Sequence, residues 1–131
     1  MTKSKIEKLA NEIRTFLDDN FLNGDVRIYF NGKALSHGEE DSYITWNNEI
    51  KDYEDKPSRT PWKVIENIDP REYFDYTSDI LCMSFEGSLY DCLNGCTTYD
   101  GKIYDKLQNI FNKYGCYFEL GNCWNLAAFE N

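Results

Sequence analysis

The fold is decided by residues 25–35, which read DVRIYFNGKAL. Apolar side chains stand at every second position from Val26 to Phe30, and this period of two is that of a β-strand with one face toward a core. Asn31-Gly32 follows, a dipeptide that favours a tight two-residue turn because both positions tolerate positive φ. A return strand is expected to reach Leu35. Because hairpins pair their strands antiparallel, the stretch predicts an α+β fold built on an antiparallel or mixed sheet.

Two amphipathic helices are expected, one before this hairpin in the sequence and one after it. Apolar residues recur at three- and four-residue steps over residues 4–20 and again over residues 102–114. Thr2 or Ser4 can cap the first helix, and Asn23-Gly24 offers it a left-handed stop. Both helices are expected to pack on one face of the sheet, because each has a single apolar stripe to bury.

Two further segments predict the rest of the sheet. Residues 80–85 are almost continuously apolar, which is typical of a central strand covered on both faces. Residues 116–120 and 123–129 flank Gly121-Asn122, which suits the turn of a second hairpin. Together with the first hairpin, these segments predict a sheet of about four to six strands in a single domain over residues 1–131.

The middle of the chain differs from these periodic segments. Residues 36–79 are polar and acidic, with aromatic residues at irregular intervals. A short strand is expected at residues 43–46, and a loop at residues 57–61, where two prolines remove backbone donors. Asp69-Pro70 resembles the start of a short helix.

Cysteine and histidine usage argues against a metal centre. The odd number of cysteines, and a charged N-terminal segment in place of a signal peptide, predict free thiols in a cytoplasmic protein. Paired zinc ligands are usually separated by two to four residues, whereas six residues separate Cys116 from Cys123. We therefore expect core thiols, no metal and no cofactor. His37 is the one histidine and is predicted to lie in a surface loop. The five cysteines are Cys82, Cys92, Cys96, Cys116 and Cys123.

Net charge excludes several classes of ligand. The chain carries 14 Lys and Arg against 23 Asp and Glu, a net charge of −9, and its pI is about 4.5. This charge disfavours direct binding to nucleic acid, whose backbone needs cationic neutralisation, and binding to an anionic membrane. No apolar run approaches the roughly 20 residues that a membrane-spanning helix needs. Residues 39–79 hold twelve acids and five bases, so this third of the chain carries −7 of the total.

Aromatic residues lie among these carboxylates, a composition that suits a protein-binding surface. Tyr and Trp supply large contact areas at low entropic cost, and clustered carboxylates accelerate encounter with a basic cleft. We therefore expect a non-enzymatic domain that docks on a basic protein partner such as a nuclease or another nucleic-acid-binding enzyme. No catalytic residue is assigned. The candidate binding residues are Glu39, Glu40, Asp41, Trp46, Glu49, Asp52, Tyr53, Glu54, Asp55 and Trp62.

In size, charge and α+β character the chain resembles the small acidic proteins that neutralise nucleases: phage anti-CRISPR and antirestriction proteins, and the immunity proteins of bacterial toxin systems. This resemblance implies inhibition by carboxylates that imitate phosphates. It rests on no residue-level motif, so no functional residue is transferred from it.

Three alternatives stay open. Acidic faces often serve solubility alone. A small divalent-metal-dependent hydrolase or nuclease is one alternative. The pattern of carboxylates and a lysine found in metal-dependent nucleases is echoed by Asp41, Glu49 and Lys51. A second carboxylate pair, Glu86 and Asp91, follows the central strand. A structural accessory domain is another, in which an edge strand pairs with its copy in a homodimer.

Overall fold

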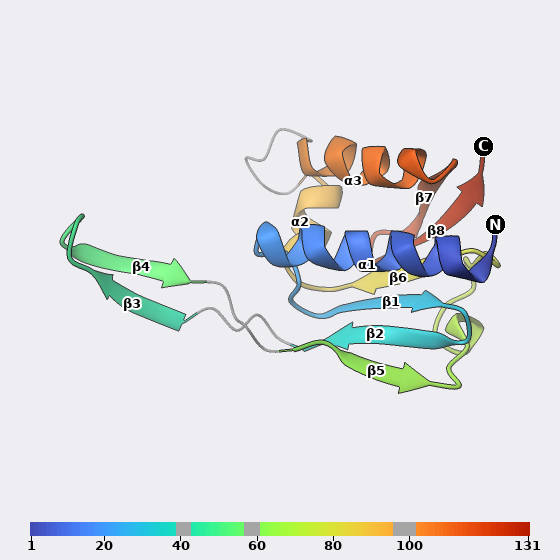
Figure 1. Ribbon diagram of the computed structural model, residues 1–131, viewed down its shortest axis with the longest axis horizontal. Helices are drawn as coiled ribbons and strands as arrows, with labels where there is room; N and C mark the ends of the chain where they lie inside the picture. Colours follow the sequence, from blue (N-terminus) through green and yellow to red (C-terminus); the bar gives the residue numbers. More distant parts are fainter. Residues whose placement is uncertain (39–42, 57–60, 96–101) are drawn as a thin grey trace.

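Six strands form an antiparallel sheet in the computed structural model, which describes residues 1–38, 43–56, 61–95 and 102–131 (Figure 1). The strand order is β5-β2-β1-β6-β8-β7, and a separate two-stranded sheet pairs β3 with β4. This arrangement confirms the predicted α+β class. The strands are β1 (Val26–Phe30), β2 (Lys33–His37), β3 (Tyr43–Asn47), β4 (Asp52–Lys56), β5 (Lys63–Glu66), β6 (Cys82–Phe85), β7 (Cys116–Asn122) and β8 (Asn125–Glu130). The helices are α1 (Lys3–Asp19), the 3-10 turn η1 (Pro70–Glu72), α2 (Ser88–Leu93) and α3 (Lys102–Lys113).

One face of the six-stranded sheet is covered by α1 and α3, as predicted (Figure 1). The stripe of α1 includes Leu9 and Ile13, and that of α3 includes Leu107 and Phe111, all fully buried in one core cluster. Phe111 meets Phe118 of β7 with ring centroids 5.1 Å apart. None of the helices in the described part of the chain has the length and apolar character that crossing a bilayer requires.

The opposite face, which we call the back face, is covered without a long helix. Residues 67–81 cross it and contribute Ile68 and Phe74 to a second cluster of buried residues. Tyr29 of β1 packs edge-to-face on Phe74 at 5.5 Å and is only 3% exposed. Strand β6 pairs with β1 on one side and β8 on the other, and both faces of the sheet are covered there. This central position agrees with its continuously apolar sequence.

The turns follow the sequence in one hairpin and differ from it in two places. Asn31 and Gly32 adopt φ of 49° and 77° between β1 and β2, as predicted. The left-handed residue after α1 is Phe21, with φ of 59°, instead of Asn23-Gly24. Thr2 caps α1, accepting a hydrogen bond from the Lys5 backbone N–H. The turn between β7 and β8 falls at residues 123–124, because β7 continues through the expected turn to Asn122 and β8 begins two residues later than expected, at Asn125.

The middle third is more ordered than its sequence predicts. The expected strand at residues 43–46 is confirmed as β3, but β4 and β5 were not expected there. Their sequences, DYEDK and KVIE, carry too many charges to resemble half-buried strands. The expected helix at Asp69-Pro70 is a single 3-10 turn capped by Asp69. Of the predicted loop at 57–61, residues 57–60 lie outside the described residues.

Candidate functional site

The β3–β4 hairpin extends away from the six-stranded sheet (Figure 1). Its turn is held by local contacts: the Asn47 side-chain oxygen accepts hydrogen bonds from the backbone N–H groups of Glu49, at 2.8 Å, and Ile50, at 3.3 Å. Lys51 then adopts a positive φ of 53° and leads into β4. An asparagine that bonds to backbone groups two and three residues ahead is a common turn-forming device. The turn thus fixes the register of β3 against β4.

This register brings Trp46 and Tyr53 together on one face of the hairpin. The two are direct cross-strand partners, and their rings meet edge-to-face with centroids 5.1 Å apart. Trp46 also donates its indole N–H to the Asn48 side chain at 2.8 Å. Even so, Trp46 is 49% exposed and Tyr53 is 66% exposed, and Ile50 at the turn is 59% exposed. We call Trp46 and Tyr53 the aromatic pair.

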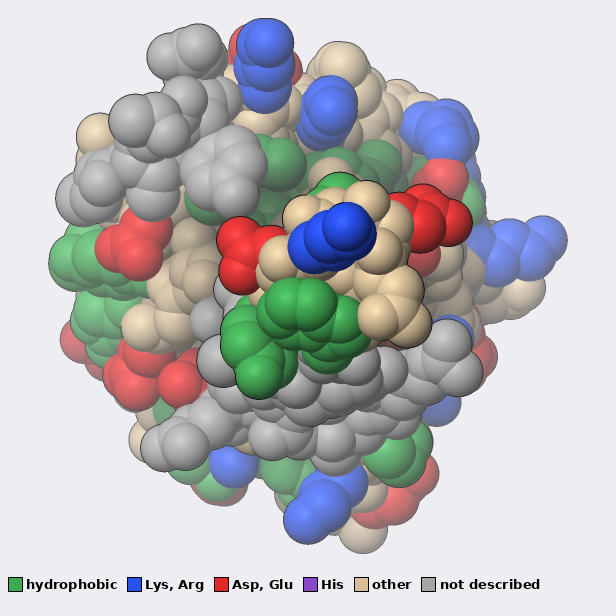
Figure 2. All heavy atoms as spheres, turned by 90° about the vertical axis from the view of Figure 1, so that its left-hand side faces the viewer, with side chains coloured by type: hydrophobic (Ala, Val, Ile, Leu, Met, Phe, Trp, Pro, Cys, Tyr) green, Lys and Arg blue, Asp and Glu red, His purple; other side chains and the backbone are tan. Residues whose placement is uncertain are grey.

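Carboxylates occupy the other face of the same hairpin. Asp52 pairs with Asn47 and Glu54 pairs with Thr45, and residues one position away from the aromatic pair on a strand point to the opposite side. Glu49 lies in the turn and is exposed, as is Asp52. Figure 2 looks onto this end of the molecule and shows hydrophobic and acidic side chains side by side around a basic side chain. The aromatic pair therefore lies on one face of the hairpin, and Asp52 and Glu54 lie on the other.

Of the remaining predicted binding residues, Trp62 is the one whose side chain the structure describes, and it lies elsewhere. Glu39, Glu40 and Asp41 lie outside the described residues, and for Asp55 only the backbone pairing with Ile44 is described. Trp62 belongs to the body of the protein, where it is half-buried against the helix-side core. Its indole N–H donates to Asp18 of α1 at 2.8 Å. Trp62 therefore lies apart from the aromatic pair in its contacts.

His37 corrects one expectation from the sequence. It ends β2, is 3% exposed, and packs edge-to-face on Trp62 with ring centroids 5.3 Å apart, so the predicted surface loop is wrong. The strand continues two residues past Leu35. His37 is the cross-strand partner of Val26 in β1, and both lie on the helix-covered face of the sheet. Its Nδ1 lies 3.1 Å from the Gly38 carbonyl oxygen.

The described residues of the candidate carboxylate sites for metal-dependent chemistry lie on the hairpin turn, after β6 and on α2. Glu49 and Lys51 are exposed on the hairpin turn, and Asp41 lies outside the described residues. Glu86 follows β6, whereas Asp91 is exposed on α2. Within the described residues, no group of three or more His, Cys, Asp or Glu side chains is arranged to hold a metal ion.

The described cysteines are mostly buried. Cys82, Cys92 and Cys116 are buried, and Cys123 is exposed. Burial raises the pKa of the thiols of Cys82 and Cys116, which keeps both protonated and weakly reactive. Cys96 lies outside the described residues.

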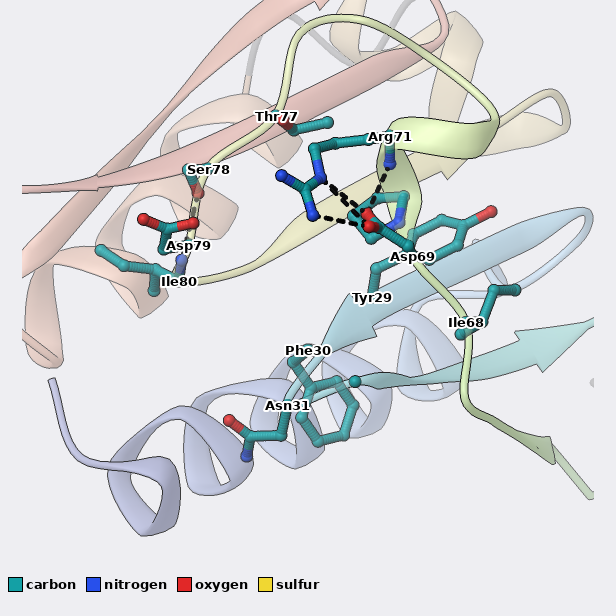
Figure 3. Close-up of a pocket in the computed structure, with 12 residues that line it drawn as sticks. Tyr29, Phe30, Asn31, Ile68, Asp69, Arg71, Thr77, Ser78, Asp79 and Ile80 are labelled. Carbon is teal, nitrogen blue, oxygen red and sulfur yellow. Dashed lines mark hydrogen bonds and ion pairs between the residues drawn. The ribbon is translucent and has the colours of Figure 1, made fainter.

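A hollow of about 250 Å³ lies between the β1–β2 turn and residues 68–80 (Figure 3). Its cation, Arg71, donates to both carboxylate oxygens of Asp69 at 2.8 to 3.1 Å. The Arg71 guanidinium lowers the pKa of Asp69, and the Asp69 carboxylate raises that of Arg71. Asp79 and Ser78 line the facing side. Because Arg71 already has its carboxylate, this hollow offers no free charge to an anion.

The acidic middle third is divided by the fold. One part forms the β3–β4 hairpin, and the other, from Glu66 to Asp79, runs along the edge strand β5 and across the back face. The acids of the second part include Asp69, which is paired with Arg71. Exposed aromatic side chains accompany described carboxylates in both parts, Trp46 and Tyr53 in the hairpin and Tyr73 in the second part, and the hairpin is the part that holds an exposed tryptophan.

These features define an α+β protein with a six-stranded antiparallel sheet and a projecting, two-faced hairpin. Comparison of the chain with protein-family models, curated proteins and solved structures finds no match. The function must therefore be argued from the hairpin and the surfaces themselves.

Proposed function

We propose that the protein is a non-enzymatic binding domain whose β3–β4 hairpin inserts into a basic cleft of a partner protein and blocks it. The observation that carries this proposal is the exposed aromatic pair. Trp46 is 49% exposed and Tyr53 is 66% exposed, and Trp and Tyr are the residue types that dominate binding energy at protein interfaces. A cleft that binds nucleic acid has the required basic charge, so a nuclease or another nucleic-acid-processing enzyme is the proposed partner.

A two-faced ribbon suits insertion better than flat docking. A ribbon inside a cleft contacts both walls, so Trp46 and Tyr53 can pack on one wall while Asp52 and Glu54 meet cationic groups on the other. The cross-strand ring contact and the Asn47 turn hold the exposed side chains in place before binding. Side chains held in this way lose less conformational entropy on association.

Charge supports the same mechanism at longer range. A molecule with a net charge of −9 is attracted to a basic cleft before contact, which speeds association at low ionic strength. Salt screens this attraction, with a Debye length of about 8 Å at physiological ionic strength. The carboxylates then occupy positions that phosphates of the partner's substrate would take, and substrate is excluded.

Capture experiments with hairpin variants test the proposal. The full chain is immobilised, proteins are captured at low salt, and the captured set is compared with that of Trp46→Ala/Tyr53→Ala and of Asp52→Lys/Glu54→Lys. Glu66→Lys/Glu72→Lys is the matched control, because it reverses the same charge at exposed positions outside the hairpin. We expect to capture a basic partner. Both hairpin variants should weaken its binding by about 2 kcal/mol or more in binding free energy, and the control should bind it as tightly as the wild type does.

Inhibition is then measured on that partner. The nuclease or nucleic-acid-binding activity should fall when the wild-type chain is added and recover with the hairpin variants. A partner bound equally by all variants, or an association rate that does not change between low and high salt, would contradict the proposal. A melting temperature that rises with magnesium or manganese would instead favour the metal-dependent alternative, since a ligand selective for the native state stabilises it.

A further inference from the structure

A polar row crosses the back face of the six-stranded sheet. Ser36 of β2 pairs with Arg27 of β1, Arg27 pairs with Ser84 of β6, and Ser84 pairs with Asn125 of β8. Directly paired residues share a face of a sheet. The neighbouring row on the same face is Ala34, Tyr29, Cys82 and Ala127, all buried in the apolar cluster.

Ser36, Arg27 and Ser84 of this row line a hollow of about 400 Å³ that differs from the one at Arg71. Its walls include Tyr73, Phe74 and Trp124, and Asp25 and Glu86 also line it. Phe74 and Trp124 meet edge-to-face at 5.7 Å, which fixes the aromatic wall. A volume of this size lies within the range of ordinary small-molecule sites.

Arg27 brings a cation into the hollow, and neither of the carboxylates that line it, Asp25 and Glu86, forms an ion pair with Arg27. Its guanidinium lies over the Tyr73 ring, 5.6 Å from the centroid, and forms no ion pair within the described residues. The hydroxyl groups of Tyr29 and Tyr73 raise its pKa further. Arg27 is thus held in position by aromatic side chains and keeps its charge available, in contrast to Arg71.

The two serines add donors that the protein itself does not use. No hydrogen bond joins the hydroxyl of Ser36 or Ser84 to another described residue, whereas Asn125 is fully engaged with the Tyr76 carbonyl oxygen and the Asn122 backbone N–H. A guanidinium flanked on both sides by hydroxyl donors matches the geometry of an oxyanion, because carboxylate and phosphate oxygens accept several hydrogen bonds in a fork.

We propose that this hollow is a binding site for a small organic oxyanion, a carboxylate or a phosphate monoester attached to a flat ring. The oxyanion would lie between Arg27 and the two serine hydroxyls, and the ring would stack against the Tyr73 and Trp124 side of the hollow. The site is independent of the hairpin and of the function proposed for it. Glu86 and Asp25 limit the charge that the site tolerates, because a highly charged ligand meets their carboxylates.

Titration of the full chain with four probes tests the site, with backbone amide NMR as the readout. Benzoate and phenyl phosphate carry both parts of the ligand and separate the carboxylate from the phosphate. Inorganic phosphate carries the anion alone, and benzamide carries the ring alone. We expect benzoate, phenyl phosphate or both to shift amides around Arg27, Ser36 and Ser84, with each single-part probe about tenfold weaker.

Variants then assign the binding groups. Arg27→Gln should weaken binding about tenfold or more, since a charged hydrogen bond contributes about 1.5–3 kcal/mol. Arg71→Gln is the matched control and should leave affinity unchanged. Glu86→Gln should strengthen binding, a gain that damage to the fold would not produce. If Arg27→Gln loses its folded spectrum, the Ser36→Ala/Ser84→Ala variant, which keeps the guanidinium, should still weaken binding several-fold.

Two results would overturn the proposal. One is that no probe shifts the amides of the polar row at millimolar concentration. The other is that Arg27→Gln, or the double serine variant where Arg27→Gln is unfolded, binds as tightly as the wild type. Neither result bears on the hairpin, whose experiment reports a protein partner.

Discussion

At the scale of single residues, the protein places its charges in two different ways. Arg71 and Asp69 neutralise each other two positions apart in the chain, and the sequence alone makes that pairing plausible. Arg27 is separated from Tyr73 by more than forty residues, and only the crossing of residues 67–81 over the sheet brings them together. The same crossing positions Tyr76, whose hydroxyl donates to Glu119 of β7 at 2.7 Å.

Tyr76 should be visible in an alkaline titration. Its hydrogen bond to Glu119 raises the pKa of the phenol to about 12, because ionisation would lose the bond and place a phenolate beside a carboxylate. A pKa raised above its unfolded value contributes stability that is present below about pH 10 and is lost as pH rises toward 12. We expect Glu119→Gln to move the ionisation of one tyrosine toward pH 10, measured by absorbance at 295 nm.

Tyr76→Phe serves as the control for that titration, because it removes the ionising group and leaves the ring contact with Phe129. Superimposable titration curves for the wild type and Glu119→Gln would contradict the assignment. The stability contribution is small, since the phenol is partly exposed and solvent screens the pair.

At the scale of elements, the β3–β4 hairpin differs from every other strand pair. The other strands contribute to one or both core clusters, whereas none of residues 46–54, the hairpin positions whose side chains the structure describes, belongs to either cluster. Its stability comes from the cross-strand aromatic contact and the Asn47 turn. Such a hairpin serves recognition better than packing.

Removing the hairpin should leave the body folded. In the test variant, a short Gly-Ser linker replaces residues 43–56. We expect its free energy of unfolding to lie within about 1 kcal/mol of the wild-type value, because shortening a loop changes its closure entropy only slightly. Thermal unfolding followed by circular dichroism measures this. Partner binding should be lost in the same variant. Failure to fold would show that the hairpin packs on the body and would weaken the docking proposal.

At the scale of the whole molecule, one sheet supports two cores. The helix side buries Phe118 at 1% exposure, and the back side buries Phe74 at 6%. Both clusters include residues of β1, β6 and β8, so disruption of one face should be felt on the other. This shared sheet is the physical basis for expecting one cooperative domain.

Substitutions on the two faces test that cooperativity. Phe118→Ala should destabilise the protein by about 3–5 kcal/mol, the usual cost of removing a buried phenylalanine, and Phe74→Ala should cost less because the irregular segment around it can collapse. Urea unfolding followed by both tryptophan fluorescence and circular dichroism should give one midpoint in each variant. Two separated transitions in Phe74→Ala would show that residues 67–81 unfold alone.

The sequence alone determined the features that depend on neighbours in the chain. The periods of α1 and α3, the Asn31-Gly32 turn and the apolar run of β6 are local patterns, and each predicts its element because burying that pattern requires a single conformation. The aromatic and acidic composition of residues 39–62 predicts a binding surface there, and this stays a prediction. Asn47-Asn48 after residues 43–46 was a local signal for the turn of the β3–β4 hairpin, whereas the charged sequence of β4, DYEDK, carries no strand pattern.

Only the tertiary structure decided which of these side chains meet. It separated Trp62 from Trp46, buried His37 against Trp62, and placed the aromatic pair on the hairpin face opposite Asp52 and Glu54. It also joined Arg27 to two serines from other strands and to Tyr73 from the crossing segment. These outcomes depend on strand register and on contacts between distant segments, because a shift of one residue moves every side chain of a strand to the opposite face.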